Sequence, residues 1–205
     1  MRYGVNGQGQ SLRLLVLGDS AAAGVGVDTQ AEALTGQLLA QLSDRYEVQW
    51  RLLATTGHTL AQVLDDLNQL EGQTFDVVVL SVGVNDATGR TSIKVWQQQY
   101  RTLLSQLEQR FGSQLMLCSS VPPMHLFSAL PQPLRWFMGQ QAKQLNKALQ
   151  QLLASQQKAV FMPIEFELSP AYLAADGFHP SHLAYTVWAQ QLAVRISNDI
   201  LFVAD

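Results

Sequence analysis

The chain has 205 residues, 47% of them hydrophobic, and its 16 acidic residues against 13 Lys and Arg give a net charge of −3. This length suits one well-cored α/β domain rather than two, so we expect residues 1–205 to form a single domain. The small acidic excess, without any block of like charge, argues against a nucleic-acid partner.

Cysteine and histidine are too sparse for a recognisable metal site. The single cysteine, Cys118, excludes an intramolecular disulfide, and its apolar surroundings in the sequence predict a buried structural thiol. The four histidines show no metal-ligand spacing such as HExxH. We therefore expect no metal and no other cofactor.

The residues before the first predicted strand contain no apolar segment typical of a signal peptide, and no run reaches membrane-spanning length. A cytoplasmic protein without stable membrane insertion is the expectation. A periplasmic or secreted protein whose signal peptide had been removed would have the same sequence.

Apolar runs of strand length alternate with segments of helical period along the chain. Strands are predicted at residues 14–17, 47–53, 75–82, 114–119 and 159–162. Helices are predicted at residues 32–42, 59–67, 93–112 and 133–154, and from about residue 181 onward.

This alternation predicts a parallel sheet with helices on both faces. We expect a three-layer α/β/α, doubly wound fold whose five-stranded sheet has the flavodoxin-like order 2-1-3-4-5. The second strand, which is the more polar one, would then lie at an edge.

The first strand runs into Gly18-Asp19-Ser20 and then into small residues. Ser20 therefore follows the carboxyl end of a central strand, which is where open α/β sheets bind ligands. This position makes Ser20 a candidate nucleophile. On this stretch alone, a helix cap is an equally good interpretation.

Three further loops carry residues that a serine nucleophile needs. In the turn at residues 176–180, His179 can act as the base and Asp176 can orient it. The N–H groups of Ser20 and Gly57 and the side-chain amide of Asn85 can form an oxyanion hole. The segment after the fifth strand is long enough to return across the sheet to Ser20.

These blocks resemble the GDSL family of esterases and lipases, also called SGNH hydrolases. The matching residues are Ser20 in Gly18-Asp19-Ser20, Gly57, Asn85 in Gly83-Val84-Asn85-Asp86, and His179 in Asp176-Gly177-Phe178-His179-Pro180. The resemblance implies a three-layer α/β/α fold and metal-free hydrolysis of esters or thioesters through an acyl-serine. The chain departs from the family name at Ala21, where GDSL has leucine.

Other residues in these blocks have structural interpretations. Asp19 and Asp86 are expected to hold turns, and Asn85 could itself be a turn residue. His58 could line the cleft, although a partly solvated position at the start of a helix is the simpler interpretation. The glycines at residues 24–26 lack the GxGxxG spacing of a dinucleotide site.

The sequence thus predicts a serine esterase that acts on the (thio)ester bonds of small acyl or aryl esters. The alternatives are a carbohydrate O-deacetylase and a catalytically silent binding module on the same fold. The acyl length and the oligomeric state stay open.

The segment at residues 121–138 is unusually apolar for a surface loop. One interpretation is a wall or lid for a hydrophobic acyl or aryl group, with Met124 and Phe127 as substrate contacts. The other is a satellite core beneath the loop. Arg135 and His125 would add a site for an anionic head group at the rim.

Overall fold

The structure is a computed structural model that describes residues 2–164 and 169–200. The strands of these residues are β1 Arg2–Asn6, β2 Gln10–Gly18, β3 Tyr46–Ala54, β4 Val77–Ser81, β5 Leu115–Ser119 and β6 Ala159–Met162. The α-helices are α1 Ser20–Ala23, α2 Leu34–Leu42, α3 Leu60–Leu67, α4 Val84–Thr88, α5 Ile93–Gln109, α6 Leu134–Leu153 and α7 His182–Ile200. Two short 3₁₀ helices are η1 Met124–Leu126 and η2 Pro170–Tyr172.

The strands form one sheet in the order β1-β3-β2-β4-β5-β6. All neighbours from β3 to β6 are parallel, and these five strands have the predicted order 2-1-3-4-5. The α/β/α fold class is therefore confirmed. The central strand β4 is buried at every residue, as expected for a strand covered on both faces.

The prediction of five strands is wrong, because β1 adds a sixth strand antiparallel to β3. The predicted edge strand, β3, therefore lies inside the sheet. Strand β1 is hard to recognise in the sequence because four of its five residues are exposed and show no apolar alternation. Its Gly4 lies opposite Trp50, and a Cβ there would be 3.0 Å from the indole ring.

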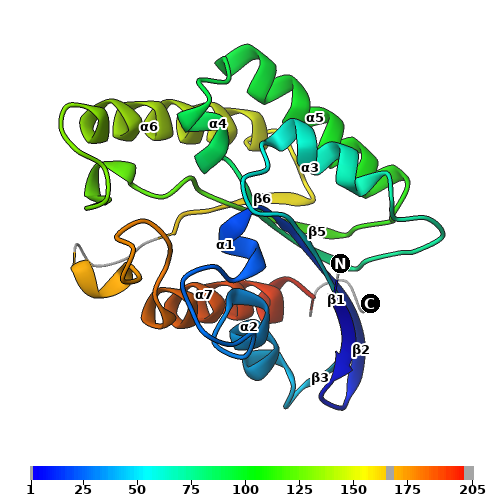
Figure 1. Cartoon of the computed structure of the whole chain (residues 1–205). Coiled ribbons are helices and arrows are strands. Elements are labelled where there is room, and N and C mark those ends of the chain that lie inside the picture. Colours follow the sequence, from blue (N-terminus) through cyan, green and yellow to red (C-terminus); the bar gives the residue numbers. More distant parts are fainter. Residues whose placement is uncertain (1, 165–168, 201–205) are drawn as a thin grey trace.

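Helices cover the two faces of the sheet in separate groups. Figure 1 shows α3, α4, α5 and α6 on one face and α2 and α7 on the other. Side chains of β4 alternate between two hydrophobic clusters: Val78 and Leu80 pack with α3, α5 and α6, whereas Val77 and Val79 pack with α2 and α7. Cys118 is fully buried in β5, as predicted.

The helix boundaries follow local sequence signals. The start of α3 is marked by Thr59, whose backbone N–H donates to the side-chain oxygen of Gln62 at 3.0 Å, as in a capping box. Strand β6 has the bounds that the sequence predicts.

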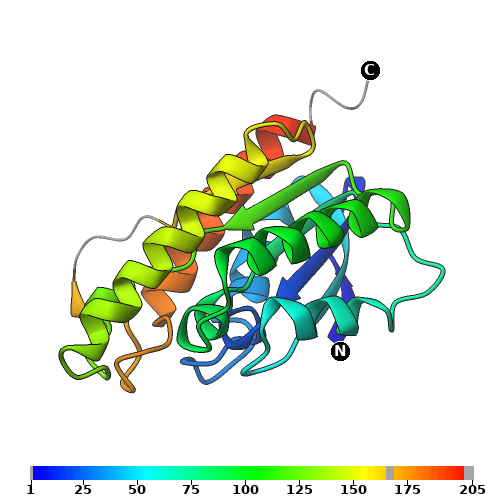
Figure 2. The same cartoon turned by 90° about the horizontal axis from the view of Figure 1, so that it is seen from above.

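The carboxyl ends of the three central strands lie at one edge of the sheet. Gly18 at the end of β2 pairs with Ala54 of β3 and with Ser81 of β4. The loops that leave these strands therefore begin side by side. Viewed from above, α3, α5 and α6 lie in front of the sheet and α7 lies behind it (Figure 2). None of the helices described here is long and apolar enough to cross a membrane.

Candidate active site

Ser20 lies where the backbone turns from β2 into the short helix α1. Gly18 permits this turn, because a Cβ there would lie 1.9 Å from the carbonyl oxygen of Ser81. The N–H of Asp19 donates to that Ser81 carbonyl at 3.0 Å, and the Asp19 side chain accepts from the N–H of Ala21 at 3.1 Å. Asp19 therefore caps the turn that presents Ser20.

Asp176 and His179 share one tight turn before α7. The Oδ1 atom of Asp176 accepts hydrogen bonds from the N–H groups of Phe178 at 2.9 Å and His179 at 3.0 Å. Gly177 has a φ of +66°, and a Cβ there would lie 2.4 Å from Ser128 Oγ. Glycine is therefore required both by the turn and by its contact with the loop after β5.

The structure brings Ser20, His179 and Asp176 together in one hydrogen-bonded chain. His179 Nε2 lies 3.2 Å from Ser20 Oγ, and His179 Nδ1 lies 2.6 Å from Asp176 Oδ2. Burial would raise the pKa of the Asp176 carboxyl, but hydrogen bonds from the His179 ring and from backbone N–H groups outweigh it and lower that pKa. Asp176 can thus accept the Nδ1 hydrogen and direct Nε2 toward the serine.

The sequence-predicted oxyanion donors lie on the neighbouring strand ends. Gly57 lies in the loop after β3 with a φ of +85°, and its N–H donates to none of the described residues. Asn85 lies on α4, and its Nδ2 donates to the carbonyl of His58 at 3.0 Å. Because an amide nitrogen carries two hydrogens, Asn85 keeps a second one for a substrate.

Two buried carboxyl groups, those of Asp19 and Asp86, are the sequence neighbours of Ser20 and Asn85. Burial and, to a smaller extent, the charge of the nearby Asp86 raise the pKa of Asp19 to about 7. Burial also raises the pKa of Asp86, which accepts hydrogen bonds from the N–H of Leu60 at 2.9 Å and from Thr91 Oγ1 at 3.0 Å. Asp86 therefore connects α4 to the start of α3, a structural role that the sequence predicts.

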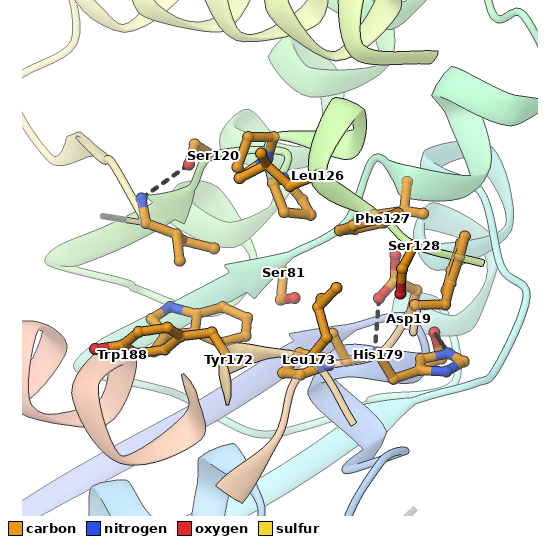
Figure 3. A pocket seen from close by; sticks show the side chains of 18 of the residues that line it. Asp19, Ser81, Ser120, Leu126, Phe127, Ser128, Tyr172, Leu173, His179 and Trp188 are labelled. Carbon is orange, nitrogen blue, oxygen red and sulfur yellow. Dashed lines mark hydrogen bonds between the residues drawn. The ribbon is translucent and has the colours of Figure 1, made fainter. Parts of the chain in front are cut away.

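A pocket of about 300 Å³ opens beside Ser20 and His179. Figure 3 shows His179 and Ser128 at one end, and Trp188 and Ser120 toward the other. The wall formed by the loop after β5 consists of Ser120, Pro122, Pro123, Leu126, Phe127 and Ser128. The opposite wall, around α7, consists of Tyr172, Leu173, Phe178, His179, Pro180 and Trp188. Most of these side chains are apolar, and no lysine or arginine is among them.

Comparison with known protein families identifies the family of this chain. The model of the GDSL-like Lipase/Acylhydrolase family matches residues 16–187. The chain belongs to this family. A search among curated proteins finds no match.

Solved structures share the GDSL-like fold. A lipase/acylhydrolase from Enterococcus faecalis is 18% identical, with 91% of this chain and 96% of that one covered and a TM-score of 0.71. TesA is 22% identical, with 91% and 98% covered and a TM-score of 0.72. A family two carbohydrate esterase from Clostridium thermocellum is 15% identical, with 94% and 65% covered and a TM-score of 0.72. At these identities the similarity establishes the fold alone.

The prediction that Met124 contacts the substrate is wrong. Its side chain is fully buried in the core and does not line the pocket, because η1 turns it inward against α6. Phe127 does line the pocket, and its ring lies 4.9 Å from that of Phe178. Sequence reasoning overlooked Trp188, whose place on the apolar stripe of α7 indicates core packing. It also overlooked Phe178, although this residue adjoins His179.

Proposed function

We propose that the protein hydrolyses carboxylic ester or thioester bonds of acyl or aryl esters through an acyl-serine intermediate on Ser20. The observation that carries the proposal is the hydrogen-bonded chain from Asp176 through His179 to Ser20 at the mouth of an apolar pocket. Membership of the GDSL-like family supports a hydrolase of this kind.

In this mechanism, Ser20 Oγ attacks the substrate carbonyl carbon while His179 Nε2 takes the hydroxyl proton. The negative charge on the carbonyl oxygen is stabilised by the N–H groups of Ser20 and Gly57 and by the Asn85 amide. The Asp176 carboxylate stabilises the resulting imidazolium.

The tetrahedral intermediate then collapses. The bond from the carbonyl carbon to the leaving oxygen or sulfur breaks, and His179 returns its proton to that atom. Water adds to the acyl-serine with His179 again as base, which releases the carboxylic acid and restores the hydroxyl of Ser20.

The pocket favours an acyl or aryl ester over an acetylated sugar. A sugar ring needs several hydrogen-bond partners, whereas the walls of this pocket are mainly Leu, Phe, Pro and Trp side chains. The carbohydrate esterase among the similar structures is the reason to keep O-deacetylation as the rival activity.

The test is hydrolysis of p-nitrophenyl esters of graded chain length beside acetylated xylo-oligosaccharides. We expect a burst of nitrophenol, greater efficiency on acyl chains longer than acetate, and inactivation by a phosphonate that labels Ser20. Ser20→Ala and His179→Ala should lose nearly all activity while keeping the wild-type circular dichroism spectrum. Wild-type turnover by Ser20→Ala would disprove the proposed nucleophile, and a preference for the sugar would favour the rival activity.

A further inference from the structure

The loop at residues 55–58, between β3 and α3, carries Gly57 but has little packing of its own. Thr55, Thr56 and Gly57 are exposed, and no heavy atom lies within 4 Å of a Cβ placed on Gly57. The N–H of Thr55 donates to the Gly18 carbonyl at the end of β2 at 3.2 Å, and within the loop the N–H of His58 donates to the Thr55 carbonyl at 3.2 Å. A loop with so few contacts needs another restraint to hold a fixed position.

His58 supplies a restraint from the side of α3. Its Nδ1 lies 2.9 Å from Oδ2 of Asp66, in the second turn of that helix, and both side chains are mostly buried, with 23% and 14% exposed. A carboxylate oxygen accepts hydrogen bonds, so Nδ1 of His58 is the donor. Thr55 Oγ1 contacts the same oxygen at 3.5 Å, the outer limit of a hydrogen bond.

The backbone of His58 faces the candidate active site. Its carbonyl accepts the hydrogen bond from Asn85 Nδ2 at 3.0 Å. One residue therefore bonds to Asp66 through its ring and to Asn85 through its carbonyl. A shift of that carbonyl would turn the Asn85 amide, and with it the hydrogen that remains for the oxyanion.

We propose that His58 and Asp66 form a positioning pair that holds the Asn85 amide in the orientation required for oxyanion stabilisation. This inference rests on the proposed esterase function and assigns a role to two residues outside the motif blocks. The pair does not touch substrate, so its effect reaches the reaction through Asn85. Misplacement of a donor by a fraction of an ångström lowers kcat more than KM, since the donor acts mainly on the transition state.

The experiment measures kcat and KM with p-nitrophenyl butyrate. Asn85→Ala alone should lower kcat by about 10²–10³, the usual loss for one oxyanion donor. His58→Ala and Asp66→Ala should each lower kcat by about tenfold, a fraction of that loss, with KM nearly unchanged. His58→Asn and Asp66→Asn each retain a polar group in place of the one removed, so these variants should recover most of the wild-type kcat.

A double-mutant cycle separates positioning from general stabilisation. If His58 acts through Asn85, His58→Ala should cost less than about twofold in kcat when Asn85 is already alanine. The control is Lys158→Ala, which removes the Lys158–Glu108 ion pair near the start of β6 and should leave kcat unchanged.

Equal losses of kcat in both backgrounds would overturn the proposal, as would a His58→Ala variant with wild-type kcat and a lower Tm alone. These outcomes are distinct from failure of the esterase function. In that case wild-type protein would show no Ser20-dependent hydrolysis, and the proposed role of the pair would fall with it.

Discussion

Asp19 adjoins the candidate nucleophile, and only 2% of its surface is exposed. Its pKa is raised from an ordinary value of 3.8 to about 7, first by burial and then by Asp86. Between these two pH values the unfolded chain has lost the proton while the folded protein still holds it. The folded state therefore loses stability relative to the unfolded state as pH rises through this window.

We predict that Asp19→Asn removes this pH dependence. We expect a change with pH in the difference between the unfolding free energies of wild type and variant. This difference should fall by up to about 1.4 kcal/mol per pH unit between pH ~4 and ~7, and it should be constant above pH ~7. Urea denaturation at a series of pH values measures it. A difference that stays constant or rises with pH would mean that Asp19 is ionised in the folded protein throughout.

At the scale of elements, the turn that carries His179 depends on Gly177. Alanine there must adopt a φ of +66° and would also collide with Ser128 Oγ. The turn should therefore move away from the loop after β5 and displace the imidazole from Ser20. We predict that Gly177→Ala lowers kcat on an activated ester by about 10²-fold, the loss expected for a misplacement near 1 Å.

Gly72→Ala is the matched control for Gly177→Ala. Gly72 has a φ of +64°, almost the same as that of Gly177, but nothing lies within 4 Å of a Cβ at that position. This variant bears the backbone strain without the collision, so it should lose stability and keep kcat. If the two variants lose kcat alike, the effect of Gly177→Ala is not local to the turn.

The loop after β5 provides a second prediction at this scale. Phe127 is 4% exposed and lines the pocket against Phe178. Phe127→Ala should weaken transition-state binding of an octanoyl ester by about 1–3 kcal/mol and leave an acetyl ester nearly unaffected. The ratio of kcat/KM for the two esters measures this selectivity.

Met124→Ala is the control from the same loop, because Met124 is fully buried in the core and does not line the pocket. Met124→Ala should lower the free energy of unfolding by about 2–5 kcal/mol and change kcat/KM for the octanoyl and acetyl esters by the same factor. Should Phe127→Ala behave in the same way, Phe127 would be a packing residue.

The comparison of these two residues shows where the sequence stops being informative. Hydrophobic periodicity predicts every long helix and all five parallel strands, because each buries a regular face. Loop 121–138 has no period, so the sequence does not reveal that Met124 points inward whereas Phe127 faces the pocket. Helices α1 and α4 are too short to show a period at all.

For the whole molecule, the site is more predictable than its surroundings. Ser20, Gly57, Asn85 and His179 lie in short sequence blocks outside the long helices and the strands, and the parallel topology gathers these blocks at one edge of the sheet. The pocket instead combines side chains from the ends of β4 and β5, the segment before α7 and α7 itself. Trp188 packs in the hydrophobic core and also lines the pocket. The apolar stripe of α7 predicts the first role, whereas the second is visible only in the packed structure.

Strand β1 covers the outer edge of β3, and this arrangement leads to a prediction for the whole molecule. Tyr3 and Val5 are 72% and 62% exposed, so β1 adds little to the core. Its main contribution is to pair the backbone groups of β3, which would otherwise form an open edge for other chains. Deleting residues 2–6 should therefore promote self-association, while the protein that stays folded should keep the wild-type kcat in the ester assay of the proposed function.

Light scattering over a range of protein concentrations measures self-association. An ester assay at the lowest of these concentrations measures kcat. Arg2→Ala is the control, because it removes the hydrogen bond from Arg2 Nη1 to the Ala23 carbonyl at 3.2 Å and leaves the strand in place. We expect this variant to match wild type in mass at every concentration. If it associates as the deletion does, the contact with Ala23 matters more than the covered edge. If the deletion variant keeps the wild-type mass at every concentration, the edge of β3 does not pair with other chains even without β1. The charged residues of β3, Glu47 and Arg51, would then be enough to prevent that pairing.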